Sequence, residues 1–141
     1  MSDLAEAIRA ELSSIADILD QLPADRSCSH LSALELAGAA AILHSFYNGM
    51  EKILKQVVRS RQVEVPEGPS SHRALVDMAV RMGLLSTATA SELAPFLAFR
   101  HFFRHSYALD LSADQMEPLV SGARRVHELF EMDMGNALGQ G

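Results

Sequence analysis

Apolar residues recur at every third or fourth position through almost the whole chain, and this spacing restricts the fold more than any other feature. In the first segment the repeat is carried by Leu4, Ile8, Leu12, Ile15, Leu19 and Leu22. Such a stripe is one face of an amphipathic helix. Alternation typical of a strand is confined to residues 63–65, "VEV". The sequence therefore predicts an all-α protein.

Caps and breakers divide this pattern into about five helices. Ser2 is the expected N-cap of the first helix, and Pro23 its stop. Ser32 and Glu35 have the spacing of a capping box, which would begin a long second helix that reaches about Gln62.

The third and fourth helices are bounded by similar signals. Ser71 is the expected N-cap of the third helix, and Gly83 marks its end. Thr89 and Glu92 predict a capping box for the fourth helix, in which Pro95 favours a kink or a later start.

The last helix is expected to begin at Ser112, with Gln115 completing the cap, and Pro118 suggests an irregular first turn. Residues 135–141 form a glycine-rich tail that we expect to fray. Short connections between the helices predict an up-and-down bundle. The 141 residues have the size of one domain, residues 1–141.

Composition excludes several classes of protein. The single cysteine, Cys28, rules out an internal disulfide framework and a cysteine-based zinc site. The start of the chain has no apolar segment of the secretory type, and no run of about eighteen apolar residues follows. We therefore expect a cytoplasmic protein without a membrane segment. The net charge of −6 argues against a general nucleic-acid coat but leaves room for a local cationic site.

Residues 99–110, "FRHFFRHSYALD", combine aromatic, cationic and protonatable side chains. On an ideal helix one arc holds Phe99, Phe102, Phe103 and Ser106. A separate arc holds Arg100, Arg104 and Tyr107, with His101 and His105 beside it. The segment thus predicts a helix with an aromatic core face and a distinct cationic face.

Three interpretations of the cationic face follow from the residues alone. It could be an ordinary solvated face of an amphipathic helix. His101 and His105 have the i, i+4 spacing of a two-histidine metal site, although two arginines beside them would repel a cation. The face could instead bind an anion, because arginine presents a fork of donors to phosphate. Histidine can then move a proton, so RNA could be cleaved through its own 2′-hydroxyl without a metal.

The order Arg100-x4-His105-x-Tyr107 resembles the Arg-x4-His-x-Tyr signature of the HEPN superfamily, in its HepT-like branch. Three further segments fit this branch in the usual order: residues 45–55 "SFYNGMEKILK", 72–78 "HRALVDM" and 99–111 "FRHFFRHSYALDL". The resemblance covers a domain core of about residues 30–130. It implies a helical bundle that commonly dimerises, with the motifs of two protomers meeting at the interface.

The resemblance also implies a function. Many HEPN proteins are metal-independent endoribonucleases, and HepT-like members are toxins of toxin–antitoxin pairs. Their partner is a small MNT-type nucleotidyltransferase, which in this family can neutralise the toxin by adding AMP to the motif tyrosine. Carried over to this chain, Arg100 would hold the scissile phosphate, His105 would transfer a proton, and Tyr107 would be the target of AMPylation. No cofactor or metal ion is expected.

Arg100 and His105 lie about 140° apart on one ideal helix, so one straight helix does not bring them to a single phosphate. A kink, or a second copy across a two-fold axis, would solve this. Arg104 and His101 could add phosphate contacts or be merely solvated. Asn48 and Glu51, which are polar residues of an otherwise apolar helix, could orient the motif arginine or histidine, or lie on the helix surface.

We predict structural roles for the other polar residues. We expect His44 and Tyr47 to be packing residues with satisfied polar tips, and His72 to be a surface histidine near a helix cap. Arg124, Arg125 and His127 are expected to be exposed, with a basic rim for RNA as the alternative.

Two main functions therefore stand at this point. The first is a metal-independent ribonuclease toxin. The second is a non-catalytic binding module of the same fold that pairs with a nucleotidyltransferase; a nucleotide- or metal-binding bundle, based on His101 and His105, is a minor third. Convergence of Arg100 and His105 of two chains on a concave, solvent-open pocket would favour the enzyme, and internal salt bridges of these side chains would favour the binding module.

Overall fold

Five α-helices and one short 3-10 helix form the part of the chain that the computed structural model describes, residues 3–107 and 110–139. In chain order they are α1 (Asp3–Leu19), η1 (Cys28–His30), α2 (Ala33–Ser60), α3 (Ser71–Arg81), α4 (Thr87–Arg104) and α5 (Ala113–Gly139). These residues contain no β-strand. The prediction of an all-α bundle of about five helices is therefore confirmed.

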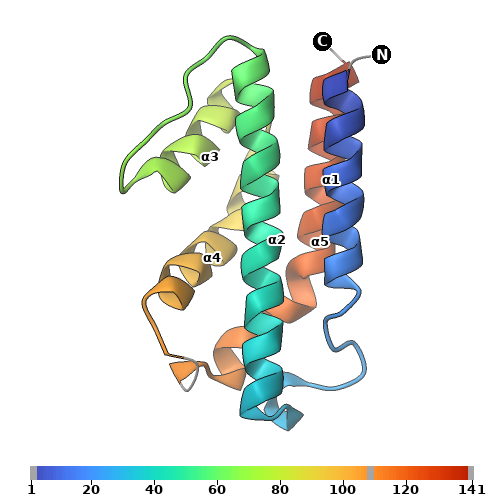
Figure 1. Cartoon of the computed structure of the whole chain (residues 1–141), viewed down its shortest axis with the longest axis vertical. Helices are drawn as coiled ribbons and strands as arrows, with labels where there is room; N and C mark the ends of the chain where they lie inside the picture. Colours follow the sequence, from blue (N-terminus) through green and yellow to red (C-terminus); the bar gives the residue numbers. More distant parts are fainter. Residues whose placement is uncertain (1–2, 108–109, 140–141) are drawn as a thin grey trace.

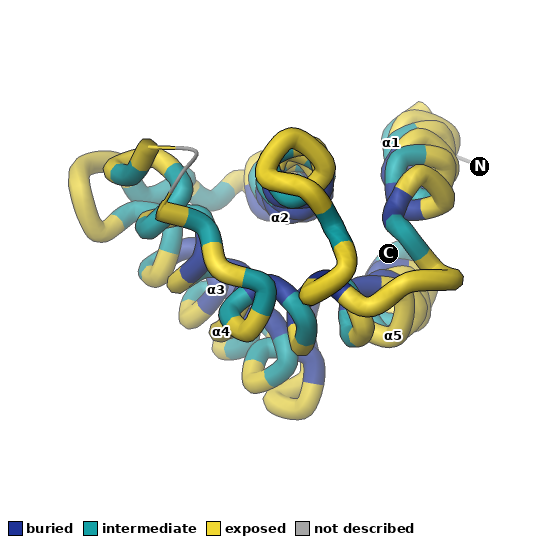
Figure 2. The backbone as a smooth tube through the Cα atoms, turned by 90° about the horizontal axis from the view of Figure 1, so that it is seen from below, coloured by how far each residue is buried: buried dark blue, intermediate teal, exposed yellow. Residues whose placement is uncertain are grey.

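Helix α2 is the centre of the arrangement. It packs against each of the other four α-helices. The long helices α1, α2 and α5 run side by side, and α3 and α4 lie on the other side of α2 (Figure 1). Viewed from below, α2 stands between the pair α1–α5 and the pair α3–α4 (Figure 2). Its fully buried side chains, among them Leu43, Phe46, Met50, Ile53 and Leu54, fill the space between these pairs.

Several predicted helix ends are confirmed. Ser32 and Glu35 form the expected capping box at the start of α2, with Ser32 Oγ accepting the Glu35 N–H at 3.1 Å and Glu35 Oε1 accepting the Ser32 N–H at 2.9 Å. Gly83 follows α3 with φ of 76°, in the left-handed region that glycine adopts without strain. Ser112 Oγ accepts the Gln115 N–H at 3.1 Å at the start of α5. Ser2 lies outside the described residues.

Two predicted helix starts are wrong. Ser71 is the first residue of α3, and Ser70 is its N-cap. Helix α4 begins at Thr87 rather than through a capping box of Thr89 and Glu92, because Ser86 Oγ accepts the Thr89 N–H and takes the N-cap position. Asp133 of α5 fixes Ser86 by accepting its backbone N–H at 3.0 Å, a contact between distant segments that local spacing does not reveal.

Neither proline ends or delays its helix. Helix α4 continues through Pro95, and α5 continues through Pro118. The predicted fraying of residues 135–141 is wrong for residues 135–139, which belong to α5, and residues 140–141 lie outside the described part. Ala137 is buried, and its carbonyl oxygen accepts a hydrogen bond from Arg61 Nη2 at 2.9 Å, so tertiary contacts hold this end. None of the helices in the described ranges has the length and apolar character needed to cross a membrane.

Helices α1 and α2 approach closely at Gly49. A Cβ atom at this position would lie 2.7 Å from Cδ1 and 2.8 Å from Cγ1 of Ile15, which is buried. Gly38, in the same helix, has open space around the corresponding position.

This difference predicts opposite effects for the same substitution. We expect Gly38→Ala to raise the free energy of unfolding by about 0.5–1 kcal/mol, since alanine restricts the unfolded chain. We expect Gly49→Ala to lose that gain and to be less stable than Gly38→Ala by about 1–3 kcal/mol, since the new methyl group overpacks the contact with Ile15. Urea denaturation of both variants measures the difference; equal stabilisation would contradict the close approach.

Candidate functional site

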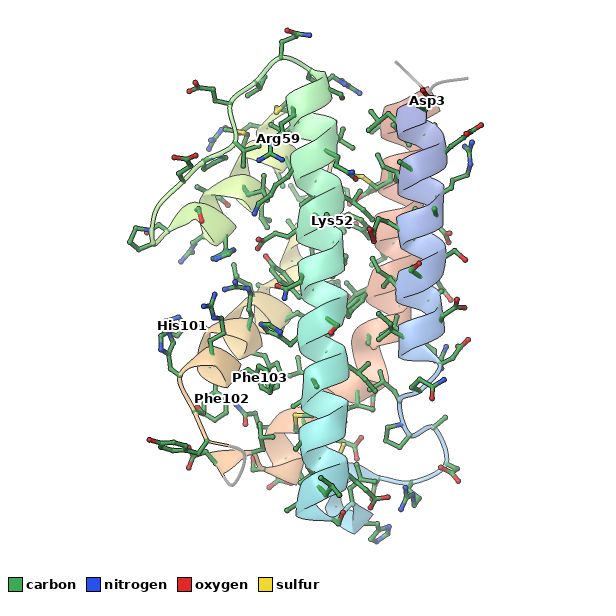
Figure 3. The ribbon with its side chains drawn as sticks, in the orientation of Figure 1. Asp3, Lys52, Arg59, His101, Phe102 and Phe103 are labelled. Carbon is green, nitrogen blue, oxygen red and sulfur yellow. The ribbon has the colours of Figure 1, made fainter. Side chains whose placement is uncertain are left out.

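Phenylalanines fix α4 against α2. Phe96 and Phe99 of α4 are buried, and the ring of Phe96 meets Phe46 of α2 edge to face with centroids 5.4 Å apart. Phe103 packs against Phe99 at 5.9 Å and against the imidazole of His44 at 5.0 Å. In Figure 3 Phe103 lies between α4 and α2, whereas His101 points away from α2. The predicted separation of an aromatic core face from a polar face is therefore confirmed for residues 99–104, whereas Ser106 and Tyr107, which were expected on the same helix, lie beyond the end of α4.

Arg100 is held by α2 through Asn48. The Arg100 Nε–H donates to Asn48 Oδ1 at 3.2 Å, and Arg100 is half-buried. No acidic side chain among the described residues pairs with Arg100, and its two terminal nitrogens make no hydrogen bond to them. Asn48 thus contacts the motif arginine while leaving the outer edge of its guanidinium available to a ligand.

His44 extends this chain of contacts into the core. The Asn48 side-chain nitrogen donates to His44 Nδ1 at 3.4 Å, which places the proton of a neutral imidazole on Nε2. His44 Nε2 is buried and has no hydrogen-bond partner among the described residues. Burial lowers the pKa of His44, and the positive charges of Arg100 and Arg104 lower it further. His44 is therefore a neutral histidine beside the site.

The expectation of a satisfied polar tip is met only in part for His44, because Nδ1 accepts from Asn48 while Nε2 has no partner in the described residues. The Tyr47 hydroxyl is also buried without a hydrogen-bond partner of good geometry within the described part of the chain. Burial raises the pKa of this phenol, with the negative charge of Glu51 adding to the effect. Tyr47 faces the polar interior next to Glu51, which apolar spacing alone does not indicate.

Glu51 is a buried carboxylate, with 5% of its surface exposed. His72 Nδ1 lies 2.8 and 2.7 Å from the two carboxylate oxygens, and Lys55 Nζ lies 3.7 Å from Oε1. The expectation that His72 is a surface histidine is wrong, because it is half-buried in this pair. Glu51 contacts His72 rather than the motif residues Arg100 or His105. A carboxylate on a buried helix face requires a partner, and only the fold shows which residue supplies it.

Two open clefts meet at Arg100 and His72. One, of about 380 Å³, lies between α2 and α3 and is also lined by Lys52, Lys55 and Arg59. The other, of about 520 Å³, lies between α3 and α4 and combines apolar side chains with polar ones, including His101 and Arg73. Arg100 therefore projects into solvent-accessible space with a surplus of positive charge.

His105 and Tyr107 lie at the exposed end of α4. Helix α4 ends at Arg104, and His105 is its C-cap, with an exposed side chain whose ring centroid is 4.7 Å from that of His101. Tyr107 is 85% exposed, and its backbone N–H donates to Asp110 Oδ2 at 2.8 Å. No hydrogen bond joins Arg100 to His105 within the described chain. Within one chain, Arg100 thus lies in the last turns of α4 and His105 and Tyr107 follow its end, without a hydrogen bond between Arg100 and His105.

The remaining candidates are accounted for by other contacts. Arg124 pairs with Asp20 at 2.8 Å, and Arg125 pairs with Glu92 at 3.3 Å. His127 is buried rather than exposed, because its Nε2 hydrogen-bonds the Leu12 carbonyl oxygen at 3.1 Å. The described ranges contain no group of three or more His, Cys, Asp or Glu side chains that could hold a metal ion, so His101 and His105 lack a third protein ligand there.

Breaking the Glu51–His72 pair from one side is predicted to destabilise the fold. We expect His72→Ala to lower the free energy of unfolding by about 1–3 kcal/mol, because it leaves the buried carboxylate without its close partner. The double variant Glu51→Gln/His72→Ala should recover part of this loss, since the unpaired charge is gone. Urea denaturation at pH 7 measures both. A double variant that is no more stable than His72→Ala would contradict the role of the carboxylate charge.

The lowered pKa of His44 predicts a pH dependence of stability. The unfolded state binds a proton more readily than the folded state, so the free energy of unfolding should fall as pH drops below the ordinary histidine pKa of about 6.5. His44→Gln should flatten this dependence between pH 7.5 and 5.5. The exposed His30 provides a matched control, and His30→Gln should retain the wild-type slope. Equal slopes for both variants and the wild type would contradict the assignment.

Comparison with known proteins agrees with the signature on α4. Residues 38–138 match the model of the family described as HepT-like protein, a span that includes the second half of the chain and most of α2. Neither a curated protein nor a solved structure gives a significant match. The matched span contains Asn48, Glu51, His72, Arg100 and His105. The chain therefore belongs to the HepT-like family.

Proposed function

We propose that this protein is a metal-independent endoribonuclease, with Arg100 binding the scissile phosphate and His105 transferring a proton. The observation that carries the proposal is the state of Arg100. The side chain is held by a neutral amide, has no acidic partner among the described residues and opens onto a cation-lined cleft. An arginine arranged in this way is prepared for an anionic ligand, because its charge is not already neutralised.

The reaction uses a nucleophile that RNA itself supplies. The 2′-oxygen attacks the adjacent phosphorus, and the bond from phosphorus to the 5′-oxygen of the next nucleotide breaks. The products are a 2′,3′-cyclic phosphate and a 5′-hydroxyl. A base removes the 2′-hydroxyl proton, and an acid returns a proton to the leaving 5′-oxygen. Arg100 offers donors for the charge that develops on the non-bridging oxygens, and His105 carries one of the proton transfers.

A homodimer would complete the site. His105 is exposed at the C-cap of α4, while Arg100 lies five residues earlier against α2. An exposed histidine can reach a phosphate held by another copy of the chain, so a two-fold interface at this end of α4 would bring Arg100 and His105 of different protomers together. We propose that the active form is such a dimer.

We further propose that the enzyme is the toxin of a toxin–antitoxin pair, and that an MNT-type nucleotidyltransferase modifies Tyr107. The 85% exposure of Tyr107 gives another enzyme access to its hydroxyl. The tyrosine oxygen would attack the α-phosphorus of ATP, release pyrophosphate and give up its proton. The attached AMP would bring a phosphate next to the cationic end of α4 and so compete with RNA.

The second candidate is a non-catalytic module that binds the nucleotidyltransferase. The observation in its favour is that one described chain does not join Arg100 to His105. The lack of an acidic partner for Arg100 speaks against it, because internal salt bridges of the motif residues are what the binding module predicts.

Cleavage of single-stranded RNA in EDTA tests the proposal. We expect the folded wild-type chain to cleave, and Arg100→Ala and His105→Ala each to lower the rate by at least about 100-fold, since general acid–base catalysis contributes about 10²–10⁴. Arg81→Ala and His30→Ala change the same residue types at exposed positions that do not line the clefts at Arg100, and should retain the rate. No cleavage by the unmodified wild type would favour the binding module.

A further inference from the structure

The cleft between α2 and α3 contains several positive charges in addition to that of Arg100. Four cationic side chains line it: Lys52, Lys55, Arg59 and Arg100. Glu51 is the one carboxylate of its lining, and His72 Nδ1 lies within hydrogen-bond distance of both of its oxygens. This local excess of positive charge belongs to a chain whose formal net charge is −6.

The cations of the cleft differ in how far they are engaged. Lys52 forms an ion pair with Glu11 of α1 at 2.6 Å, so its charge is largely accounted for. Lys55 Nζ is 3.7 Å from Glu51, a longer contact to a carboxylate that already has His72 as its near partner. Arg59 is exposed and has no ion pair within the described part of the chain. Arg59 is therefore the charge of α2 in this cleft that has no ion pair in the described residues, and Lys55 is held only by its longer contact.

These charges form a row that continues from Arg100. Asn48, Lys55 and Arg59 follow one another at steps of seven and four residues, which keeps them on one side of α2. Asn48 is the end of the row next to Arg100, because the two side chains are hydrogen-bonded. At a rise of about 1.5 Å per residue the row from Asn48 to Arg59 is about 16 Å long. Figure 3 shows Arg59 on the side of α2 that faces α3.

A row of this length is longer than one phosphate group, so it can contact several successive phosphates of a nucleic-acid backbone. Proteins that bind single-stranded nucleic acid commonly use a positively charged groove that follows the backbone. We propose that the Lys55–Arg59 side of the cleft binds phosphates of single-stranded RNA next to the phosphate held by Arg100. This rests on the proposed ribonuclease function and adds to it a phosphate-binding site on α2, outside the Arg100-x4-His105 motif.

Binding can be measured without cleavage. A fluorescently labelled 12-mer of 2′-O-methyl RNA lacks the nucleophilic hydroxyl, so anisotropy reports affinity alone. We expect Lys55→Gln/Arg59→Gln to weaken binding at least 10-fold at 0.1 M salt. The slope of log K against log salt should fall in magnitude by about 1.4, because each phosphate contact on a single strand contributes about 0.7.

One control and one further test variant accompany the double variant. Arg81→Gln removes an exposed cation from the end of α3, outside this cleft, and should change the affinity less than two-fold. Arg59→Glu reverses a charge that has no ion pair in the described residues, so it should weaken binding while the protein remains folded by circular dichroism. Binding by the double variant equal to that of Arg81→Gln would overturn the proposal. Duplex RNA of the same sequence that binds as tightly as the single strand would also overturn it.

The outcomes separate this proposal from the one on which it rests. If the wild type binds through Lys55 and Arg59 but cleaves no RNA, the cleft is an RNA-binding site and the catalytic proposal fails. If the wild type cleaves RNA and the double variant binds normally, the catalytic proposal stands and the cleft proposal fails.

Discussion

The packing of α4 against α2 is the contact on which the candidate site depends. Aromatic rings provide it: Phe96 meets Phe46, and Phe103 meets the imidazole of His44. Aromatic side chains bury large apolar surfaces and prefer defined ring geometries, so they fix both the distance and the rotation of α4. With that rotation fixed, Arg100 falls beside Asn48, and the cationic face of α4 opens toward the clefts at α3.

The polar groups beneath the site differ in their charge and in the partners that hold them. Glu51 is buried, and its carboxylate lies at hydrogen-bond distance from His72 Nδ1 and forms a longer ion pair with Lys55. Arg100 is half-buried but is held by a neutral amide, so its charge is preserved for a ligand. His44 remains neutral because burial and two arginines lower its pKa. An uncharged imidazole next to Arg100 adds no further repulsion to a site already rich in cations.

Sequence patterns predicted the local structure well where the deciding contact was itself local. The capping box of Ser32 and Glu35 was predicted correctly because its two residues are one turn apart. The start of α4 was mispredicted because Ser86 is held by Asp133, 47 residues away. The end of α5 was mispredicted for the same reason, since Arg61 of another segment caps the Ala137 carbonyl. The site shows the same division: the two faces of residues 99–104 were predicted, whereas the Glu51–His72 pair was missed.

The sequence by itself determined that the chain is helical, where α2 and α5 begin, and that one helix carries aromatic and cationic residues on separate faces. It also carried the signature that identifies the HepT-like family, confirmed over residues 38–138. These properties follow from periodicity and from motifs a few residues long. The tertiary structure decided which polar groups meet: Asn48 with Arg100 across 52 residues, and Glu51 with His72 across 21. The physical reason is that periodicity defines the faces of a helix, while the partner of a buried charge is set by how the helices cross.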